Sequence, residues 1–160
     1  MGGLPAGSIW QLPEVPAVYA LYGAAAEERR LVFVGVAESL IERLVEQLVI
    51  PNLRLRSPSA ILFMHPGYVR EIRWWEHSRF AASEPLRAAE FVASEVLRPL
   101  FSSRRPSSAP ARTLSTDDNF RAEMTALFLG EPSGRLVLPT LDELLERLAR
   151  IEERLGGGER

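Results

Sequence analysis

The sequence predicts an α+β fold: a small three-stranded antiparallel sheet flanked by helices, with a helical extension at the C-terminus. Short runs of β-branched and aromatic residues come early in the chain, two amphipathic helical repeats with N-terminal signals accompany them, and a leucine-rich repeat ends the sequence. With 160 residues, 46% apolar and 25% charged, the chain is long enough to bury a core and has a globular composition.

The first two strands are expected at 18–22 and 31–36, joined by a hairpin loop that contains GAAAEERR. A helix follows at once, because Ser39 and Glu42 have the spacing of a capping box and the leucines after them repeat at helical spacing. A proline then ends this helix, and 52–68 is interpreted as a loop with one short apolar element.

The residues after this loop predict a third strand and a second helix. Alternation over 69–77 places Ile72 and Trp74 on the same face of the strand. The helix is expected over 84–101, with Ser83 as its N-cap and a proline in its first turn.

We expect three parts in the chain: a domain over 9–103, an Arg-, Ser- and Pro-rich arm with short elements over 104–138, and an amphipathic helix over 139–156. The arm holds a short helix around 120–129 and a possible strand at 135–138.

The C-terminal helix begins with a second capping box, Thr140 and Glu143, and ends at a run of glycines. Its apolar residues occupy a and d positions of a heptad for just over two repeats: Leu141, Leu144, Leu148, Ile151 and Leu155. This pattern fits a homodimer or a partner helix as well as it fits packing on the chain's own domain.

Composition excludes several classes of function. The chain contains no cysteine, two histidines and no lysine, which excludes disulfides, thiolate catalysis, cysteine-ligated zinc and a lysine nucleophile. No run of about 18 apolar residues predicts a membrane span, and no secretory signal opens the sequence, so a cytoplasmic protein without membrane contact is expected.

The net charge of −2 is unevenly distributed. Residues 51–112 hold ten Arg and five Glu, a net charge of +5, whereas both flanking segments are acidic. A phosphate backbone would therefore be sought at this block, since phosphate neutralisation dominates affinity for nucleic acid. The arginines expected to contact the DNA backbone are Arg54, Arg56, Arg98, Arg104, Arg105 and Arg112.

Glu90 is the strongest candidate for chemistry from spacing alone. It lies on the same helical stripe as Leu86, Ala93 and Leu97, so its carboxylate should be partly buried. An uncompensated buried carboxylate costs several kcal/mol. An arginine partner, a raised pKa or a metal ion would each compensate it.

The first strand and the first helix carry further candidates for the site of Glu90. Alternation allows Tyr19 and Tyr22 to face opposite sides of the first strand, so that one hydroxyl faces a site while the other packs. Gly35 permits close approach to the backbone, and Arg43 and Gln47 share one face of the helix that follows.

Together these residues resemble the GIY-YIG nuclease superfamily, including the nuclease half of the bacterial nucleotide-excision-repair endonuclease. Residues 17–19 (AVY) stand where the family has GIY, and 33–35 (FVG) where it has YIG. Arg43 matches the catalytic arginine of the family, and Glu90 with Pro99 matches the helix that carries the metal-binding glutamate.

The resemblance covers about 12–103 and includes departures from the family's pattern. Four positions lack supporting groups that active relatives use, and a fifth replaces the first glycine of the signature: Phe33, Val36, Gln47, Ser102 and Ala17.

The resemblance implies a divalent-metal-dependent DNA endonuclease that hydrolyses phosphodiester bonds. Glu90 would bind one magnesium or manganese ion, Arg43 would neutralise charge on the phosphoryl oxygens, and Tyr19 would position or deprotonate the attacking water. The departures keep two alternatives open. One is a catalytically silent module that binds nucleic acid or a protein partner, and the other is an interaction scaffold with Glu90 in a salt bridge.

Overall fold

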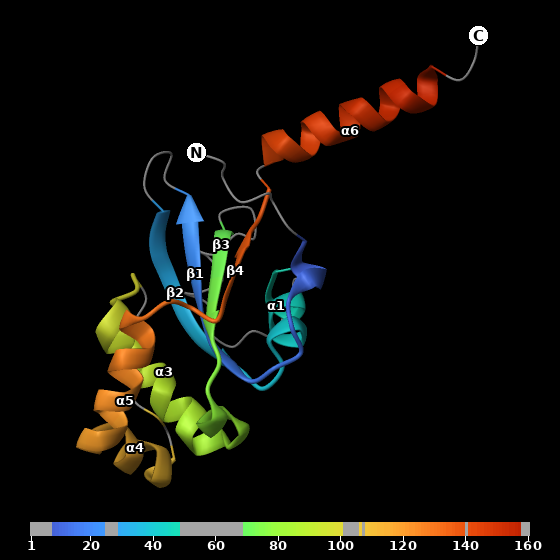
Figure 1. Cartoon of the computed structure of the whole chain (residues 1–160). Coiled ribbons are helices and arrows are strands. Elements are labelled where there is room, and N and C mark those ends of the chain that lie inside the picture. The colour runs from blue at the N-terminus through green and yellow to red at the C-terminus, as the bar shows by residue number, and fades with distance from the viewer. Residues whose placement is uncertain are drawn as a thin grey trace.

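A computed structural model describes residues 8–24, 29–48, 69–100, 106, 108–139 and 141–157. It shows an α+β fold built on one antiparallel sheet with the strand order β2-β1-β3-β4 (Figure 1). The strands are β1 (Ala17–Ala24), β2 (Arg29–Ala37), β3 (Val69–Trp75) and β4 (Gly134–Val137). The helices are η1 (Ile9–Gln11), α1 (Leu40–Leu48), η3 (Ser78–Ala81), α3 (Ser83–Leu97), α4 (Ala109–Thr116), α5 (Asp118–Leu129) and α6 (Leu141–Gly156).

The mixed α+β class is confirmed, but the sheet has four strands where three were expected. The fourth is the possible strand expected at 135–138, which pairs with β3 through Ile72 and Leu136. With β2 at one edge and β4 at the other, β1 lies inside the sheet, and its residues from Ala17 to Leu21 are fully buried.

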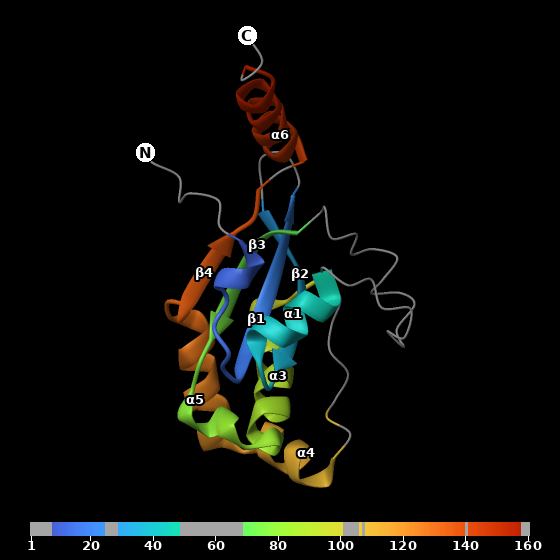
Figure 2. The same ribbon diagram turned by 90° about the vertical axis from the view of Figure 1, so that its right-hand side faces the viewer.

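Helices cover both faces of the sheet (Figures 1 and 2). On one face, α1 and η1 pack on a core that contains Tyr19, Ile72 and Leu136. On the other face, α3 and α5 pack on Val18, Ala20 and further sheet residues. Ile72 and Trp74 both face α1, as alternation predicted.

The capping box expected at the start of α1 does not form. The hydroxyl of Ser39 is buried and makes no hydrogen bond. The carbonyl oxygens of Val15 and Pro13 instead accept the first N–H groups of the helix, from Leu40 at 3.0 Å and from Ile41 at 3.3 Å. The segment before β1 therefore satisfies donors that a cap would otherwise bind.

Helix α3 also differs from prediction at both ends. Ala82, not Ser83, is its N-cap, and it makes no side-chain capping bond. The helix ends at Leu97 instead of continuing to 101, because Arg98 adopts a left-handed conformation with φ 52°. The chain then turns along the free edge of β2, where the N–H of Leu100 donates to the carbonyl of Leu31 at 3.2 Å.

The segment 104–138, expected to be an arm with short elements, contains a helix that the sequence did not suggest. Ser108 caps α4 by accepting from the N–H of Ala111 at 3.3 Å, and a proline stands in the first turn of this helix. Asp117 then caps α5 in the same way, at 2.8 Å from the nitrogen of Phe120. Both helices pack on α3, and Phe120 is part of the core.

Helix α6 projects from the body of the molecule beyond β4 (Figure 1). The first residue of the capping box expected there, Thr140, lies outside the described residues. Within the described part of the chain, no helix is both long and apolar enough to cross a membrane.

Candidate active site

The candidate site begins at a close approach between β1 and β2. Tyr19 is fully buried, and its ring passes over Gly35, its partner residue on β2. A Cβ atom on Gly35 would lie 2.7 Å from the hydroxyl oxygen of Tyr19, inside van der Waals contact. The glycine thus lets a side chain from β1 extend across the edge strand, as expected of a glycine that permits close approach. Tyr22 packs on the opposite face, so the two tyrosines are separated as predicted.

The Tyr19 hydroxyl is tied to α1. It donates a hydrogen bond to Oε1 of Gln47 at 2.8 Å. Arg43, one helical turn before Gln47, acts on the same hydroxyl and lowers its pKa. The predicted sharing of one helix face by Arg43 and Gln47 is confirmed.

Burial dominates the protonation of this hydroxyl and raises the pKa of Tyr19 to about 12. The charge and hydrogen bond of Arg43 act in the opposite direction, and the negative charge of Glu90 raises the pKa further. Since the raised value lies far above neutral pH, Tyr19 is a neutral phenol under ordinary conditions.

Glu90 reaches this group from α3. Its side chain is half-buried between the fully buried Ala89 and Ala93, which agrees with the position predicted on the apolar stripe. Its negative charge raises the pKa of Tyr19, so residues of β1, α1 and α3 that lie up to 71 positions apart in sequence interact electrostatically. Glu95 is exposed on another face of the helix and pairs with Arg121 at 2.5 Å.

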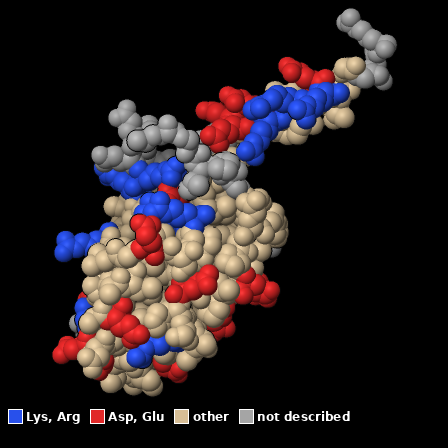
Figure 3. All heavy atoms as spheres, viewed as in Figure 1, with Lys and Arg blue, Asp and Glu red and all other residues tan. Residues whose placement is uncertain are grey.

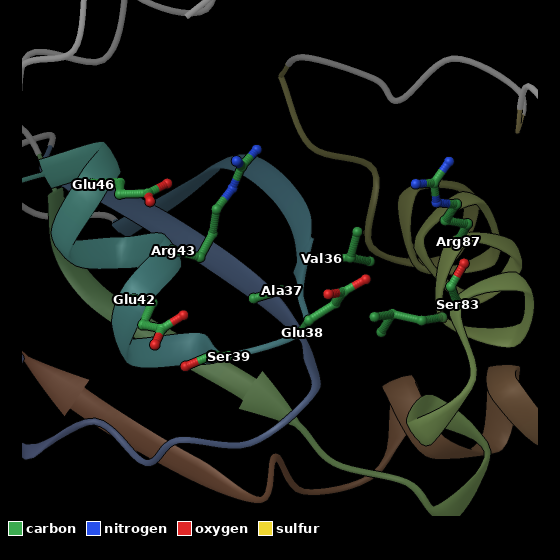
Figure 4. A pocket seen from close by; sticks show the side chains of 10 residues that line it. Val36, Ala37, Glu38, Ser39, Glu42, Arg43, Glu46, Ser83 and Arg87 are labelled. Atoms are coloured by element: carbon green, nitrogen blue, oxygen red, sulfur yellow. The ribbon is translucent and has the colours of Figure 1, made fainter.

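Beside this group lies a pocket of about 330 Å³ between the start of α1 and the start of α3 (Figure 4). Arg43 extends from one wall and Arg87 from the other, toward the same side of the pocket (Figure 4). Leu86 also lines the pocket and lies one helical turn before Glu90. Arg43 is thus the member of the candidate site that lines the pocket, whereas Tyr19 and Glu90 do not line it.

Sequence reasoning missed several residues that line this pocket. Glu38, Glu42 and Glu46 line it with Arg43 and are exposed, and Ser83 and Arg87 belong to the opposite wall. A signal for the acidic residues exists in the sequence, because positions 38, 42 and 46 are four apart; Glu42 and Glu46 share one side of α1, and Glu38 lies just before this helix. The pocket therefore combines three carboxylates with two guanidinium groups.

These donors fit a weakly held divalent cation better than a dedicated metal cage. In the part of the chain that the structure describes, no three acidic or histidine side chains are grouped to hold a metal. Magnesium commonly binds through one or two carboxylates and retains several waters. A single half-buried carboxylate such as Glu90, next to a pocket with three further carboxylates, is compatible with that mode.

Of the six arginines expected to contact DNA, only two lie among the described residues. Arg98 is exposed at the end of α3, and Arg112 is exposed on α4, where its Nη1 donates to the carbonyl of Pro106 at 3.4 Å. The others, Arg54, Arg56, Arg104 and Arg105, lie outside the described residues.

A different group of basic side chains gathers where β1 ends and β2 begins. Figure 3 shows this concentration on the body of the molecule, with acidic side chains spread over the rest of that face. At its base is Glu71, only 2% exposed, which pairs with Arg29 and with Arg73 at 2.6 Å. The guanidinium of Arg73 also lies 4.4 Å from the centre of the Tyr22 ring. Glu71 thus joins β3 to β2 across β1.

The departures from the family's pattern have definite places in the structure. Phe33 packs against Tyr19 with ring centres 6.1 Å apart, Val36 lines the pocket, and Gln47 accepts the Tyr19 hydrogen bond. Ala17 is buried in the sheet, and Ser102 lies outside the described residues. In comparisons with known proteins, no family model, no curated protein and no solved structure shows significant similarity to this chain.

Proposed function

We propose that this chain is a cytoplasmic, divalent-metal-dependent DNA endonuclease of the GIY-YIG type. The observation that carries the proposal is the meeting of Tyr19, Arg43 and Glu90, three residues singled out from sequence that come from three different elements. The pocket beside Arg43 holds a second arginine, Arg87, and we propose that a phosphate binds between the two guanidinium groups in spite of the three glutamates that also line the pocket.

Arg43 is the residue proposed to act on the phosphate. Arg43 lines the pocket, and it is close enough to the buried Tyr19 hydroxyl to lower the pKa of that group. Donors held in place before the reaction stabilise developing charge without reorganising. Arg43 would thus neutralise the phosphoryl oxygens, and Tyr19 would act as a positioning residue.

The raised pKa of Tyr19 favours positioning over proton abstraction, since a phenol with a pKa of about 12 is a poor base at neutral pH. Glu90 is the residue that would hold magnesium or manganese. Such an ion supplies Lewis-acid activation of the phosphate and stabilisation of the leaving oxygen.

The test is cleavage of branched, nicked and linear DNA by the purified chain, in magnesium and in manganese. Arg43→Ala and Glu90→Ala should each lower the rate by roughly 10²–10³. Glu95→Ala is the matched control for Glu90 because it removes an exposed carboxylate from the same helix, and Arg150→Ala is the control for Arg43. Absence of cleavage, or equal rates for Arg43→Ala, Glu90→Ala and the controls, would refute the catalytic proposal.

The second candidate function is a catalytically silent module that binds DNA. It is favoured by one observation: Tyr19 and Glu90 do not line the pocket, whereas three exposed glutamates do. In this case DNA binding without cleavage should survive Glu90→Ala, and it should weaken on charge reversal at Arg98 and Arg112. Measuring binding by fluorescence anisotropy at two salt concentrations separates this outcome from loss of both binding and cleavage.

A further inference from the structure

Helix α6 exposes a continuous apolar surface. It is 16 residues long, and all of its described side chains are exposed. In both views it points away from the sheet and its covering helices (Figures 1 and 2). The large apolar side chains on it are between 42% and 76% exposed: Leu144, Leu145, Leu148, Ile151 and Leu155. Among the residues that the structure describes, this helix therefore does not pack on the chain's own domain, which was one of the two interpretations that the sequence allowed.

The apolar side chains occupy the positions that a coiled coil requires. With Leu148 at position a, Ile151 falls at d and Leu155 at the next a. The opposite surface is polar, and there Glu146 and Arg150 form an i,i+4 ion pair at 3.8 Å. The apolar stripe is thus suited to packing against a partner helix, and the polar surface is suited to contact with water.

Charges beside the stripe select the partner and its direction. Arg147 and Arg154 occupy g positions, and Glu152 occupies an e position. In a parallel pair, a g residue faces the e′ residue of the following heptad. Arg147 of each copy would therefore face Glu152 of the other, giving two attractive pairs. An antiparallel pair would instead bring Arg147 of one copy near Arg154 of the other.

We propose that α6 pairs in parallel with α6 of a second copy of this chain. The self-complementary Arg147–Glu152 pattern matches a symmetric homodimer, in which each contact occurs twice. Because α6 follows β4, a parallel pair places both sheet domains at the same end of the coiled coil. The inference does not depend on the proposed nuclease activity.

The first test is the mass of the full chain in solution, by light scattering or sedimentation equilibrium. The wild type should approach twice the chain mass of 17.9 kDa at high protein concentration. Leu148→Asp should be monomeric. Ala149→Asp changes the next residue, which is exposed on the polar side of the same turn, and this variant should dimerise like the wild type. Far-UV circular dichroism would verify that both variants keep the secondary structure of the wild type. A monomeric wild type at hundreds of micromolar, or a dimer that survives Leu148→Asp, would overturn the proposal.

The second test determines direction. Arg147→Glu and Glu152→Arg should each weaken the dimer in a parallel pair, and the double swap should restore it. A single Leu155→Cys variant in this cysteine-free chain should form an intermolecular disulfide on oxidation, because position 155 meets its own copy only when the helices are parallel. In an antiparallel pair the two sulfurs would be roughly 20 Å apart, at 1.5 Å of rise per residue. Strengthening by Arg147→Glu alone, or no cross-link in a chain that dimerises, would contradict the parallel arrangement.

Discussion

Gly35 is the residue over which Tyr19 passes to reach α1, and the two are direct partners across β1 and β2. A Cβ atom on the glycine would lie 2.7 Å from both Cζ and the hydroxyl oxygen of Tyr19. The contact between Tyr19, Gln47 and Arg43 therefore depends on the absence of a side chain at position 35. The close approach of Tyr19 therefore explains on steric grounds alone why position 35 is a glycine in this chain.

Gly35→Ala should destabilise the fold and disturb the candidate site together. Adding a methyl group to a filled core forces neighbouring side chains away from their preferred rotamers, at a cost of about 1–3 kcal/mol. Urea unfolding would measure this loss. Gly156→Ala is the control, because a Cβ atom there meets nothing within 4 Å and alanine favours a helix. Equal stability of Gly35→Ala and the wild type would contradict the close approach of Tyr19.

Titration of Tyr19 should occur about two pH units above its usual value of 10. Because the folded state holds the phenolic proton more tightly than the unfolded state, this group's contribution to stability is complete below pH 10 and declines as the pH rises toward 12. Absorbance of the ionised phenol near 295 nm would follow the titration, and Tyr19→Phe should remove a tyrosine transition near pH 12. A Tyr19 transition near neutral pH would contradict positioning and favour the role of base.

The sequence predicted the elements whose patterns are local. β1 and β2 are short runs of β-branched and aromatic residues, β3 alternates, and α1 repeats its leucines at helical spacing; all four formed within two residues of the expected bounds. The faces of β3 were also correct, because alternation along one strand fixes which side chains share a face.

Features that depend on distant partners were not predictable in the same way. Ser39 has a cap signature, but backbone carbonyls from before β1 occupy the donors that it would have bound. The end of α3 depends on Arg98 adopting φ 52°, a left-handed conformation that the residues around Arg98 do not predict. For the site, Arg43 and Glu90 were identified, whereas the pocket's second arginine, Arg87, was not, since α1 and α3 are distant in sequence and line one pocket only in the folded chain.

Glu71→Gln should lower the free energy of unfolding at neutral pH. It should also make this free energy fall less steeply as the solution becomes acidic. Burial tends to raise the pKa of Glu71, but hydrogen bonds from Arg73 and Arg29 outweigh it and hold the pKa below its usual value of 4.5. The carboxylate therefore stabilises the fold above pH 4.5, and this contribution is lost as the pH falls through the lowered pKa. Loss of the charge-assisted bonds should cost about 1–3 kcal/mol.

Urea unfolding between pH 3 and pH 7 would test this expectation. Glu131→Gln is a suitable control, because Glu131 is 92% exposed and lies 3.6 Å from Arg135 in a surface ion pair. Such pairs contribute little to stability. The same acid dependence in the wild type and in Glu71→Gln would mean that another group dominates unfolding at low pH.

Arg98 allows a structural role and a DNA-binding role to be separated by two substitutions. Its left-handed backbone costs an L-residue with a Cβ atom roughly 1 kcal/mol, which glycine avoids. Arg98→Gly should therefore be more stable than Arg98→Ala by up to about 1 kcal/mol, because the larger backbone freedom of unfolded glycine offsets part of the gain. Both variants remove the exposed guanidinium. If Arg98 contacts phosphate, both variants should weaken DNA binding equally, and the slope of log affinity against log salt should fall by about one for each. Different DNA affinities for the two variants would show that binding requires the turn and not the charge.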